Sequence, residues 1–177
     1  RRVLFRSMNQ HVSFLFTSLL TDDCIARGKA LLDGGVRYLG GTNETYGNIN
    51  TSDSLWVIRD LVFNQKKYTL RQLNDAMLAN FNGYEALRKD CLNCDKYGND
   101  LETADTMAND LYEFVAKGVR NRGIAIGMQY FLIVISNNQL NTEWGNRTAA
   151  SPDGRLSCMY MNPANNPQGG AAKSGPT

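Results

Sequence analysis

The sequence predicts an α/β fold that is rich in helices and contains one or two buried strands. Apolar side chains recur every three or four residues over most of the first 120 positions, which is typical of helices that bury one face. The later run Met-Gln-Tyr-Phe-Leu-Ile-Val-Ile at 128–135 is continuously apolar and dominated by β-branched and aromatic residues. Such a run is typical of a strand buried on both faces, as in a parallel sheet or barrel.

The first expected helix spans residues 11–32. The triplet Thr21-Asp22-Asp23 interrupts it and offers a new N-cap, so the helix restarts there. Gly34-Gly35 ends it, because glycine adopts left-handed dihedral angles without a Cβ clash. A short strand over 36–39 and a polar loop over 40–50 are expected to follow.

Four more helices are expected before the strand at 128–135. Thr69 and Gln72 have the spacing of a capping box, so one helix begins there. Asn99 is expected to cap a long helix over 101–119. From residue 136 onward the chain is rich in Asn, Gly and Pro, which predicts loop. The remaining helices are expected over 52–63, with Leu55, Val57, Ile58, Leu61 and Val62 buried, and over 84–92.

The composition is that of an ordinary globular protein. The chain has 177 residues, of which 42% are hydrophobic and 20% are charged, enough for one domain with a core. No apolar stretch reaches the roughly 18 residues that a membrane span requires. Four cysteines are too few for a disulfide framework, so a reducing compartment is expected.

The charge balance does not favour nucleic acid as a partner. The formal net charge is +2. Residues 1–7 read like the translated end of a sequencing adapter, and we expect them to be an artefact. Without Arg1, Arg2 and Arg6 the chain has 16 basic and 17 acidic residues, so the faint positive charge disappears.

Two isolated motifs are weak candidates for chemistry. Cys91-Leu92-Asn93-Cys94 has the CxxC spacing of some redox and zinc sites, but no second CxxC accompanies it. His11 is the only histidine, and no paired motif supports a catalytic triad around it. We expect no metal site from either motif.

The turn Ser151-Pro152-Asp153-Gly154-Arg155 is the strongest candidate site. Pro152 restricts Ser151 to extended backbone, and Gly154 permits a tight turn. The turn follows the buried strand, and α/β barrels collect their functional loops at strand ends. Ser151, Asp153 and Arg155 are therefore candidates to line a substrate pocket or to brace its loops. Asp153 is expected to accept backbone amides or pair with a base. Arg155 is expected to brace loops or, alternatively, to contact an anionic substrate.

Several short segments together resemble one known family. Motifs such as Asn80-Phe81-Asn82-Gly83-Tyr84-Glu85 and Lys96-Tyr97-Gly98-Asn99-Asp100 occur in that family's order and cover nearly everything after residue 7. The other segments are 17–28, 33–38, 53–55, 61–63, 151–155, 166–170 and 175–177. On this ordered set the chain resembles the glycyl radical enzymes, the pyruvate formate-lyase-like family.

The resemblance implies that residues 8–177 form part of a ten-stranded α/β barrel. It implies radical cleavage of a carbon–carbon or carbon–heteroatom bond in a small molecule, in an anaerobic bacterial cytoplasm. A radical-SAM activase installs a backbone radical on a glycine in such enzymes, and a cysteine thiyl radical then takes hydrogen from the substrate. The resemblance also implies a homodimer with no nucleic-acid or membrane partner, and no cofactor bound directly by this segment.

No segment matches the family's thiyl-cysteine loop or its radical-glycine loop. The chain is therefore expected to lie between them as a fragment without catalytic residues, inactive alone. The segment 80–85 looks more like the diol-, choline- and hydroxyproline-type lyases and dehydratases than like pyruvate formate-lyase. Two alternatives stay open: a formate C-acetyltransferase of the pyruvate formate-lyase type, and a non-enzymatic helical interaction module.

Overall fold

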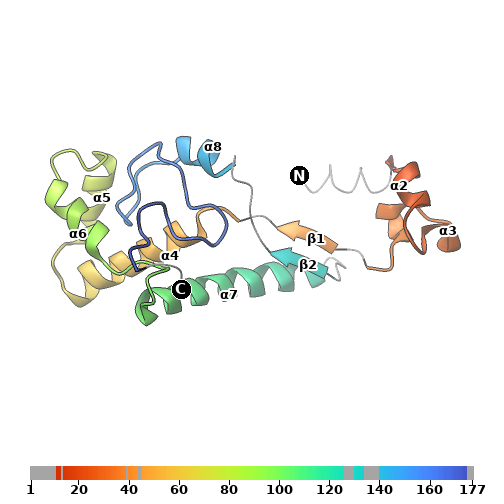
Figure 1. Ribbon diagram of the computed structural model, residues 1–177, viewed down its shortest axis with the longest axis horizontal. Coiled ribbons are helices and arrows are strands. Elements are labelled where there is room, and N and C mark those ends of the chain that lie inside the picture. The colour runs from red at the N-terminus through yellow and green to blue at the C-terminus, as the bar shows by residue number, and fades with distance from the viewer. Residues whose placement is uncertain are drawn as a thin grey trace. The chain divides into compact units, whose positions relative to one another are not determined.

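The computed structural model describes residues 11–12, 14–38, 40–43, 45–125, 130–133 and 140–174, and helices dominate them (Figure 1). The proposed adapter-like residues 1–7 lie outside these ranges. The chain divides into two compact units, one made of Arg1–Thr42 and Arg120–Leu132 and the other of Asn43–Val119 and Ile133–Thr177. We call them unit 1 and unit 2. In the described residues, no helix is long and apolar enough to cross a bilayer.

Unit 1 contains short helices where one longer helix was expected. Helix α2 spans Leu15–Leu19 and α3 spans Cys24–Arg27, followed by the kinked turn η1 at Leu31–Gly35. The chain breaks at the predicted triplet, but Asp23 has a φ of 72° and caps nothing with its side chain. Its carboxylate instead accepts two hydrogen bonds from the Arg37 guanidinium, at 2.9 and 3.0 Å.

The strand predicted at 36–39 is wrong in position. Residues 36–38 are bends, and strand β1 spans Gly40–Asn43. The Val36 carbonyl accepts a hydrogen bond from Arg27 Nη1 at 3.0 Å. In a sheet this carbonyl would instead accept from the backbone N–H of a neighbouring strand. β1 pairs with β2 at Tyr130–Ile133, which lies inside the apolar run 128–135. The flanks of that run lie outside the described residues.

Unit 2 is built around a long helical segment, with α4 at Asn48–Val57 continuing directly into the π-helix η2 at Ile58–Asn64. The capping box predicted at Thr69 is confirmed: Gln72 N donates to Thr69 Oγ1 at 3.2 Å, and Thr69 N donates to Gln72 Oε1 at 2.8 Å. The other helices of unit 2 are α5 at Leu70–Leu78, α6 at Glu85–Asn93 and α8 at Leu140–Asn146. Helix α7 at Glu102–Ile124 belongs to unit 2 up to Val119 and to unit 1 from Arg120.

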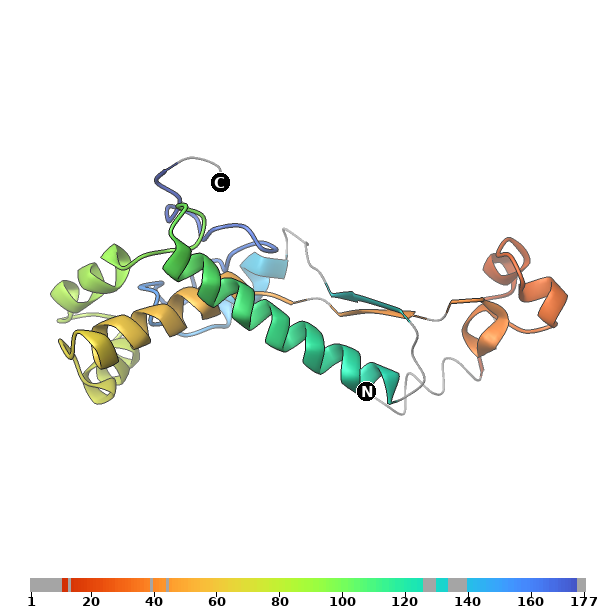
Figure 2. The same cartoon turned by 90° about the horizontal axis from the view of Figure 1, so that it is seen from below.

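Two expectations for the second half of the chain are wrong. Asn99 does not cap α7, because its amide donates to the carbonyls of Lys96 and Ala171 and its Oδ1 accepts from Lys173 N. Asn99 therefore connects the C-terminal loop to the segment before α7 by hydrogen bonds. The region expected to be all loop contains α8, which Thr148 helps to end by donating from Oγ1 to Trp144 O at 2.6 Å. The rest of 147–174 is an irregular chain that lies beside α4 (Figures 1 and 2).

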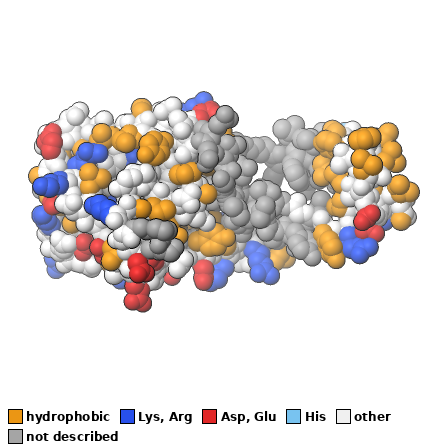
Figure 3. Space-filling view, viewed as in Figure 1, with side chains coloured by type: hydrophobic (Ala, Val, Ile, Leu, Met, Phe, Trp, Pro, Cys, Tyr) orange, Lys and Arg blue, Asp and Glu red, His pale blue; other side chains and the backbone are white. Residues whose placement is uncertain are grey.

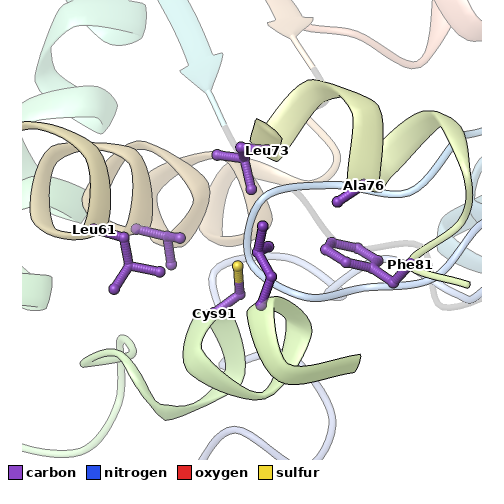
Figure 4. Close-up of a cluster of buried hydrophobic side chains, with 7 residues drawn as sticks. Leu61, Leu73, Ala76, Phe81 and Cys91 are labelled. Atoms are coloured by element: carbon purple, nitrogen blue, oxygen red, sulfur yellow. The ribbon is translucent and has the colours of Figure 1, made fainter. Parts of the chain in front are cut away.

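The hydrophobic core of unit 2 gathers side chains from α4, η2, α5, α6 and the turn after α5 (Figure 4). Phe81 is 2% exposed although it lies in a turn with a φ of 62°. The turn holds because Phe81 N donates to Ala76 O at 2.7 Å. The complete cluster is Val57, Leu61, Leu73, Ala76, Phe81, Leu87 and Cys91.

We predict that Phe81→Ala lowers the free energy of unfolding by about 3–5 kcal/mol, because it leaves a cavity in the hydrophobic core of unit 2. Leu78→Ala is the matched control, since Leu78 is close in sequence but 80% exposed. It should change stability by less than about 0.5 kcal/mol. Chemical denaturation of both variants measures the difference, and equal effects would contradict the assigned core.

Candidate functional site

The turn 151–155 is closed by its own backbone and packed against α6. Gly154 N donates to Ser151 O and Ser151 N donates to Arg155 O, both at 3.0 Å. Gly154 has a φ of 93°, and a Cβ at this position would lie 2.7 Å from the Leu92 side chain. Only glycine satisfies both the dihedral angle and the close approach to α6.

The Asp153 carboxylate is buried and fully hydrogen-bonded. Oδ1 accepts from Ser151 Oγ at 2.5 Å and from Arg155 N at 3.3 Å, and Oδ2 accepts from Asn50 Nδ2 at 2.7 Å. Asp153 N donates to Ser54 Oγ at 3.2 Å. The turn is thus joined to α4 through the neutral side chains of Asn50 and Ser54.

The Arg155 guanidinium binds the chain around it. Nη1 donates to the carbonyls of Leu156 and Met159 at 3.2 and 2.8 Å, and Nη2 donates to the carbonyl of Ala149. Nε donates to Ser151 Oγ at 3.2 Å. Within the ranges that the structure covers, Arg155 forms no ion pair with a carboxylate. Its donors are directed to backbone on both sides of the turn.

Asn50 of α4 extends these contacts to the next loop. Asn50 N donates to Asn162 Oδ1 at 3.2 Å and Asn162 N donates to Asn50 Oδ1 at 2.7 Å, so each side chain accepts from the other backbone. Asn50 Nδ2 also donates to Gln168 Oε1 at 3.0 Å. We call Asn50, Ser54, Asp153, Asn162 and Gln168 the α4–loop network.

This network corrects the predicted buried face of the second helix. Val57 and Leu61 are buried, as predicted, but Leu55 is 40% exposed. Four polar residues of α4 are buried instead, and two of them, Asn50 and Ser54, hydrogen-bond to the polar loop that faces the helix. The four are Asn50, Ser52, Asp53 and Ser54.

Asp53 is the least satisfied member of this buried polar face. It is 1% exposed, and Oδ1 accepts from Tyr97 N at 3.0 Å. Oδ2 has no hydrogen-bond partner among the described residues. Burial raises the pKa of Asp53 to about 6, and the negative charges of Asp153 and Asp105 add to this, while the Tyr97 amide and the Lys96 charge oppose it.

Lys96 is a buried cation near Asp53. It is 6% exposed, and Nζ donates to the carbonyls of Cys91 at 2.5 Å and Cys94 at 3.5 Å. These carbonyls belong to the C-terminal end of α6, where the helix dipole favours a positive charge. No carboxylate oxygen of the described chain lies within 4.0 Å of Nζ, so the ammonium keeps one N–H that no described residue accepts.

Asp53, Lys96 and residues 153–155 of the turn line one cavity of about 380 Å³ in unit 2. Ser151, the third residue predicted for the site, is not among the residues that line it. The structure thus places Asp153 and Arg155 in one wall, although both use their polar atoms on the protein itself. Sequence reasoning did not single out Asp53, Lys96 or Arg88 as site residues. Asp53 and Lys96 do lie in segments 53–55 and 96–100, which carry the family resemblance. Leu92, Asn93, Gly154, Met159, Gln168, Gly169, Gly170, Ala171 and Lys173 complete the lining.

The CxxC pair and His11 contribute nothing to this cavity. Cys91 is fully buried in the core, and burial raises its pKa to about 12 and that of Cys94 to about 11. Such thiols stay protonated, unlike metal-binding or nucleophilic cysteines. All four cysteines are free, and among the residues placed by the structure no three metal-binding side chains gather. His11 is exposed.

We predict that Asp53→Asn stabilises the protein above pH 6 and has little effect near pH 4. The pKa of Asp53 is higher in the folded state than its ordinary 3.8, so folding loses stability as pH rises from about 4 to about 6. A shift of this size corresponds to about 3 kcal/mol. Asparagine keeps the acceptor for Tyr97 N and removes the charge. Thermal unfolding of both proteins from pH 4 to 8 tests this; a difference that does not change with pH would contradict it.

Comparison with known proteins agrees with the sequence resemblance. Trans-4-hydroxy-L-proline dehydratase of Clostridioides difficile is 32% identical over 95% of this chain and 21% of its own length. The B12-independent glycerol dehydratase of Clostridium butyricum superposes with a TM-score of 0.88 at 27% identity, over 97% of this chain and 22% of that one. A glycyl radical enzyme of Archaeoglobus fulgidus gives a TM-score of 0.86 at 30% identity over the same shares.

The chain thus spans about a fifth of the length of the relatives it matches. Residues 2–140 match the family described as pyruvate formate lyase-like. This match covers well over half of the sequence and includes β1, β2, α4 and the helices between them. On this evidence the chain belongs to the pyruvate formate lyase-like family.

Proposed function

We propose that this chain is a segment of a glycyl radical enzyme that cleaves a carbon–heteroatom bond of a small molecule, as a dehydratase or lyase. The observation that carries the proposal is the likeness to dehydratases along nearly the whole chain, in sequence and in structure. Two of the three related proteins are dehydratases, which favours this activity over that of a formate C-acetyltransferase. Sequence likeness to enzymes also argues against a stand-alone interaction module.

Exposed apolar side chains support the proposal that more protein surrounds this segment. In unit 1 they gather over α2 and α3, as Figure 3 shows. Phe16, Leu20 and Ile25 are each at least 70% exposed. A patch of this kind is rare on a free-standing protein and is typical of a buried interface. We propose that β1 and β2 belong to a ten-stranded α/β barrel whose other strands lie elsewhere in the enzyme.

The radical chemistry is assigned to parts of the enzyme outside this chain. A radical-SAM activase would remove a hydrogen atom from a glycine Cα, and a cysteine thiyl radical would then take hydrogen from a substrate carbon. Cys91 is enclosed in the core, where no substrate reaches it. We propose that this segment supplies scaffold and pocket wall in a cytoplasmic homodimer and binds no cofactor directly.

Within that scaffold, we propose that Ser151, Asp153 and Arg155 brace the loops at the cavity. The support is geometric, because the polar atoms of Asp153 and the donors of Arg155 are directed to α4 and to neighbouring backbone. A substrate would have to displace these contacts to use them. Direct contact of Arg155 with an anionic substrate is the alternative.

We predict that the complete protein, treated anaerobically with its activase and S-adenosylmethionine, gives a glycyl-radical doublet by electron paramagnetic resonance. The 177-residue chain under the same conditions should give none, because the radical glycine is proposed to lie outside it. Turnover of a hydroxylated substrate by the activated protein would test the dehydratase assignment. A doublet on the short chain, or no radical on the complete protein, would overturn the proposal.

We predict that Arg155→Lys lowers the stability of the complete protein by about 1.5–3 kcal/mol, because an ammonium cannot bind carbonyls on both sides of the turn as the guanidinium does. The yield of the glycyl radical should fall together with the stability, whichever substrate is present. Arg147→Lys is the control, since Arg147 pairs with Glu143 on an exposed surface. A rise in KM with unchanged stability would instead place Arg155 in contact with substrate.

A further inference from the structure

The turn between α5 and α6 exposes an asparagine that is followed by glycine. Asn82 and Gly83 are both exposed, and they are the one Asn-Gly pair in the sequence. Tyr84 N donates to Phe81 O at 3.0 Å, and Gly83 has a φ of 79°. This geometry is typical of a type II β-turn with glycine as its second central residue. The Asn-Gly pair thus forms the centre of a turn that faces solvent.

The Asn82 side chain is free to react with its own main chain. Its amide forms no hydrogen bond with any residue that the structure describes, whereas its backbone N donates to Ala79 O at 3.0 Å. A Cβ at position 83 would meet no other atom within 4 Å, so open space lies beside Gly83. Because glycine has no side chain of its own, the nitrogen of Gly83 can approach another group closely.

We propose that Asn82 is a site of spontaneous deamidation, with the main-chain nitrogen of Gly83 as the nucleophile. This nitrogen loses its proton to hydroxide and attacks Asn82 Cγ. The new C–N bond forms, the bond from Cγ to Nδ2 breaks, and ammonia leaves. Water then opens the cyclic imide, at Cγ to give aspartate or at the main-chain carbonyl to give isoaspartate. The reaction uses no oxidant, reductant or cofactor.

Glu85 restrains this reaction. Its Oε1 accepts from Gly83 N at 2.9 Å, so a carboxylate holds the N–H that must lose its proton. Hydrogen bonds from the backbone N–H groups of Glu85 and Gly83 lower the pKa of Glu85, which keeps its carboxylate charged at neutral pH. A negative charge beside the Gly83 nitrogen opposes formation of the amide anion. The turn therefore contains both the reactive pair and the group that slows its reaction.

Isoaspartate at position 82 would disturb the core of unit 2. It adds one methylene group to the main chain inside the turn, so the hydrogen bond from Tyr84 N to Phe81 O is lost. Phe81 belongs to the hydrophobic core, so the change reaches buried side chains. Asn80 Oδ1 accepts from Ser157 N at 2.8 Å, which joins the same turn to the C-terminal loop. Deamidation is thus expected to loosen both the core and this loop contact.

The test uses the complete protein before activation, incubated at pH 8, where hydroxide promotes loss of the amide proton. Peptide mass spectrometry follows the conversion of each asparagine to an acid, and isoaspartyl methyltransferase labels isoaspartate. Asn165 is the internal reference, because it is exposed in a loop but followed by the bulkier Asn166. We expect Asn82 to deamidate severalfold faster than Asn165.

Variants of Glu85 test the restraint. Glu85→Ala removes the acceptor and should raise the rate at Asn82 about tenfold. Glu85→Gln keeps a neutral acceptor and should give a rate between these two. Glu113→Ala is the matched control, because Glu113 is an exposed glutamate that pairs with Lys117, and it should leave the rate unchanged. All rates are taken relative to Asn165, so that a variant that unfolds and speeds both sites is recognised.

Hydrogen exchange measures the structural consequence. After incubation, peptides that cover residues 76–84 should exchange faster in the unaltered protein than in Asn82→Gln. The glutamine variant is protected because its longer side chain would have to close a larger and less favourable ring.

Two results would overturn the proposal. The first is a rate at Asn82 no higher than that at Asn165 in the unaltered protein. The second is a rate at Asn82 that Glu85→Ala leaves unchanged or lowers, since a lower rate would make Glu85 a base that promotes the reaction. The proposal concerns this turn alone, and neither result bears on the radical measurement, so failure here is distinguishable from failure of the proposed function.

Discussion

The reciprocal pairing of Asn50 and Asn162 is the contact on which the structure of unit 2 depends. Each side-chain oxygen accepts from the other residue's backbone, and both residues are buried. Irregular chain cannot bury its backbone unless such partners exist, because every unpaired buried N–H or C=O costs stability. Asn50 also binds Asp153 and Gln168, so one side chain of α4 fixes three positions of the loop 151–168.

This arrangement explains why α4 buries a polar face. The hydrophobic core lies farther along the same helical segment, at Val57 and Leu61, while its first turns face the loop. The helix therefore changes partners along its length, from polar loop to apolar helices. Asp53 lies near this change, and its Oδ2 is buried without a hydrogen-bond partner in the part of the chain that the structure describes. Burial therefore raises the pKa of Asp53 to about 6.

The cavity is a consequence of the same packing. The turn 151–155 approaches α6 so closely that only glycine fits at position 154, and its charged side chains bind back to the protein. The polar atoms left open in the cavity belong to Asp53 of α4 and to Lys96, which follows α6, and not to the turn. The turn 151–155, which stands out in the sequence, thus shapes the cavity. Asp53 and Lys96, which do not stand out in the sequence, supply its free polar atoms.

The sequence by itself determined the local elements whose signals are complete within a few residues. Thr69 and Gln72 form the predicted capping box because both partners lie in one helical turn. The run 128–135 contains β2, as its continuous apolar and β-branched residues predicted. The ordered motifs also indicated the family correctly. Only the tertiary structure decided which face of α4 is buried, that Asn99 binds Ala171 and Lys173 instead of a helix start, and that Asp53 and Lys96 share a cavity. These features depend on partners far away in the sequence, such as Tyr97 for Asp53, 44 residues away, and Asn162 for Asn50, 112 residues away. Neither hydrophobic periodicity nor capping spacing carries information over such separations.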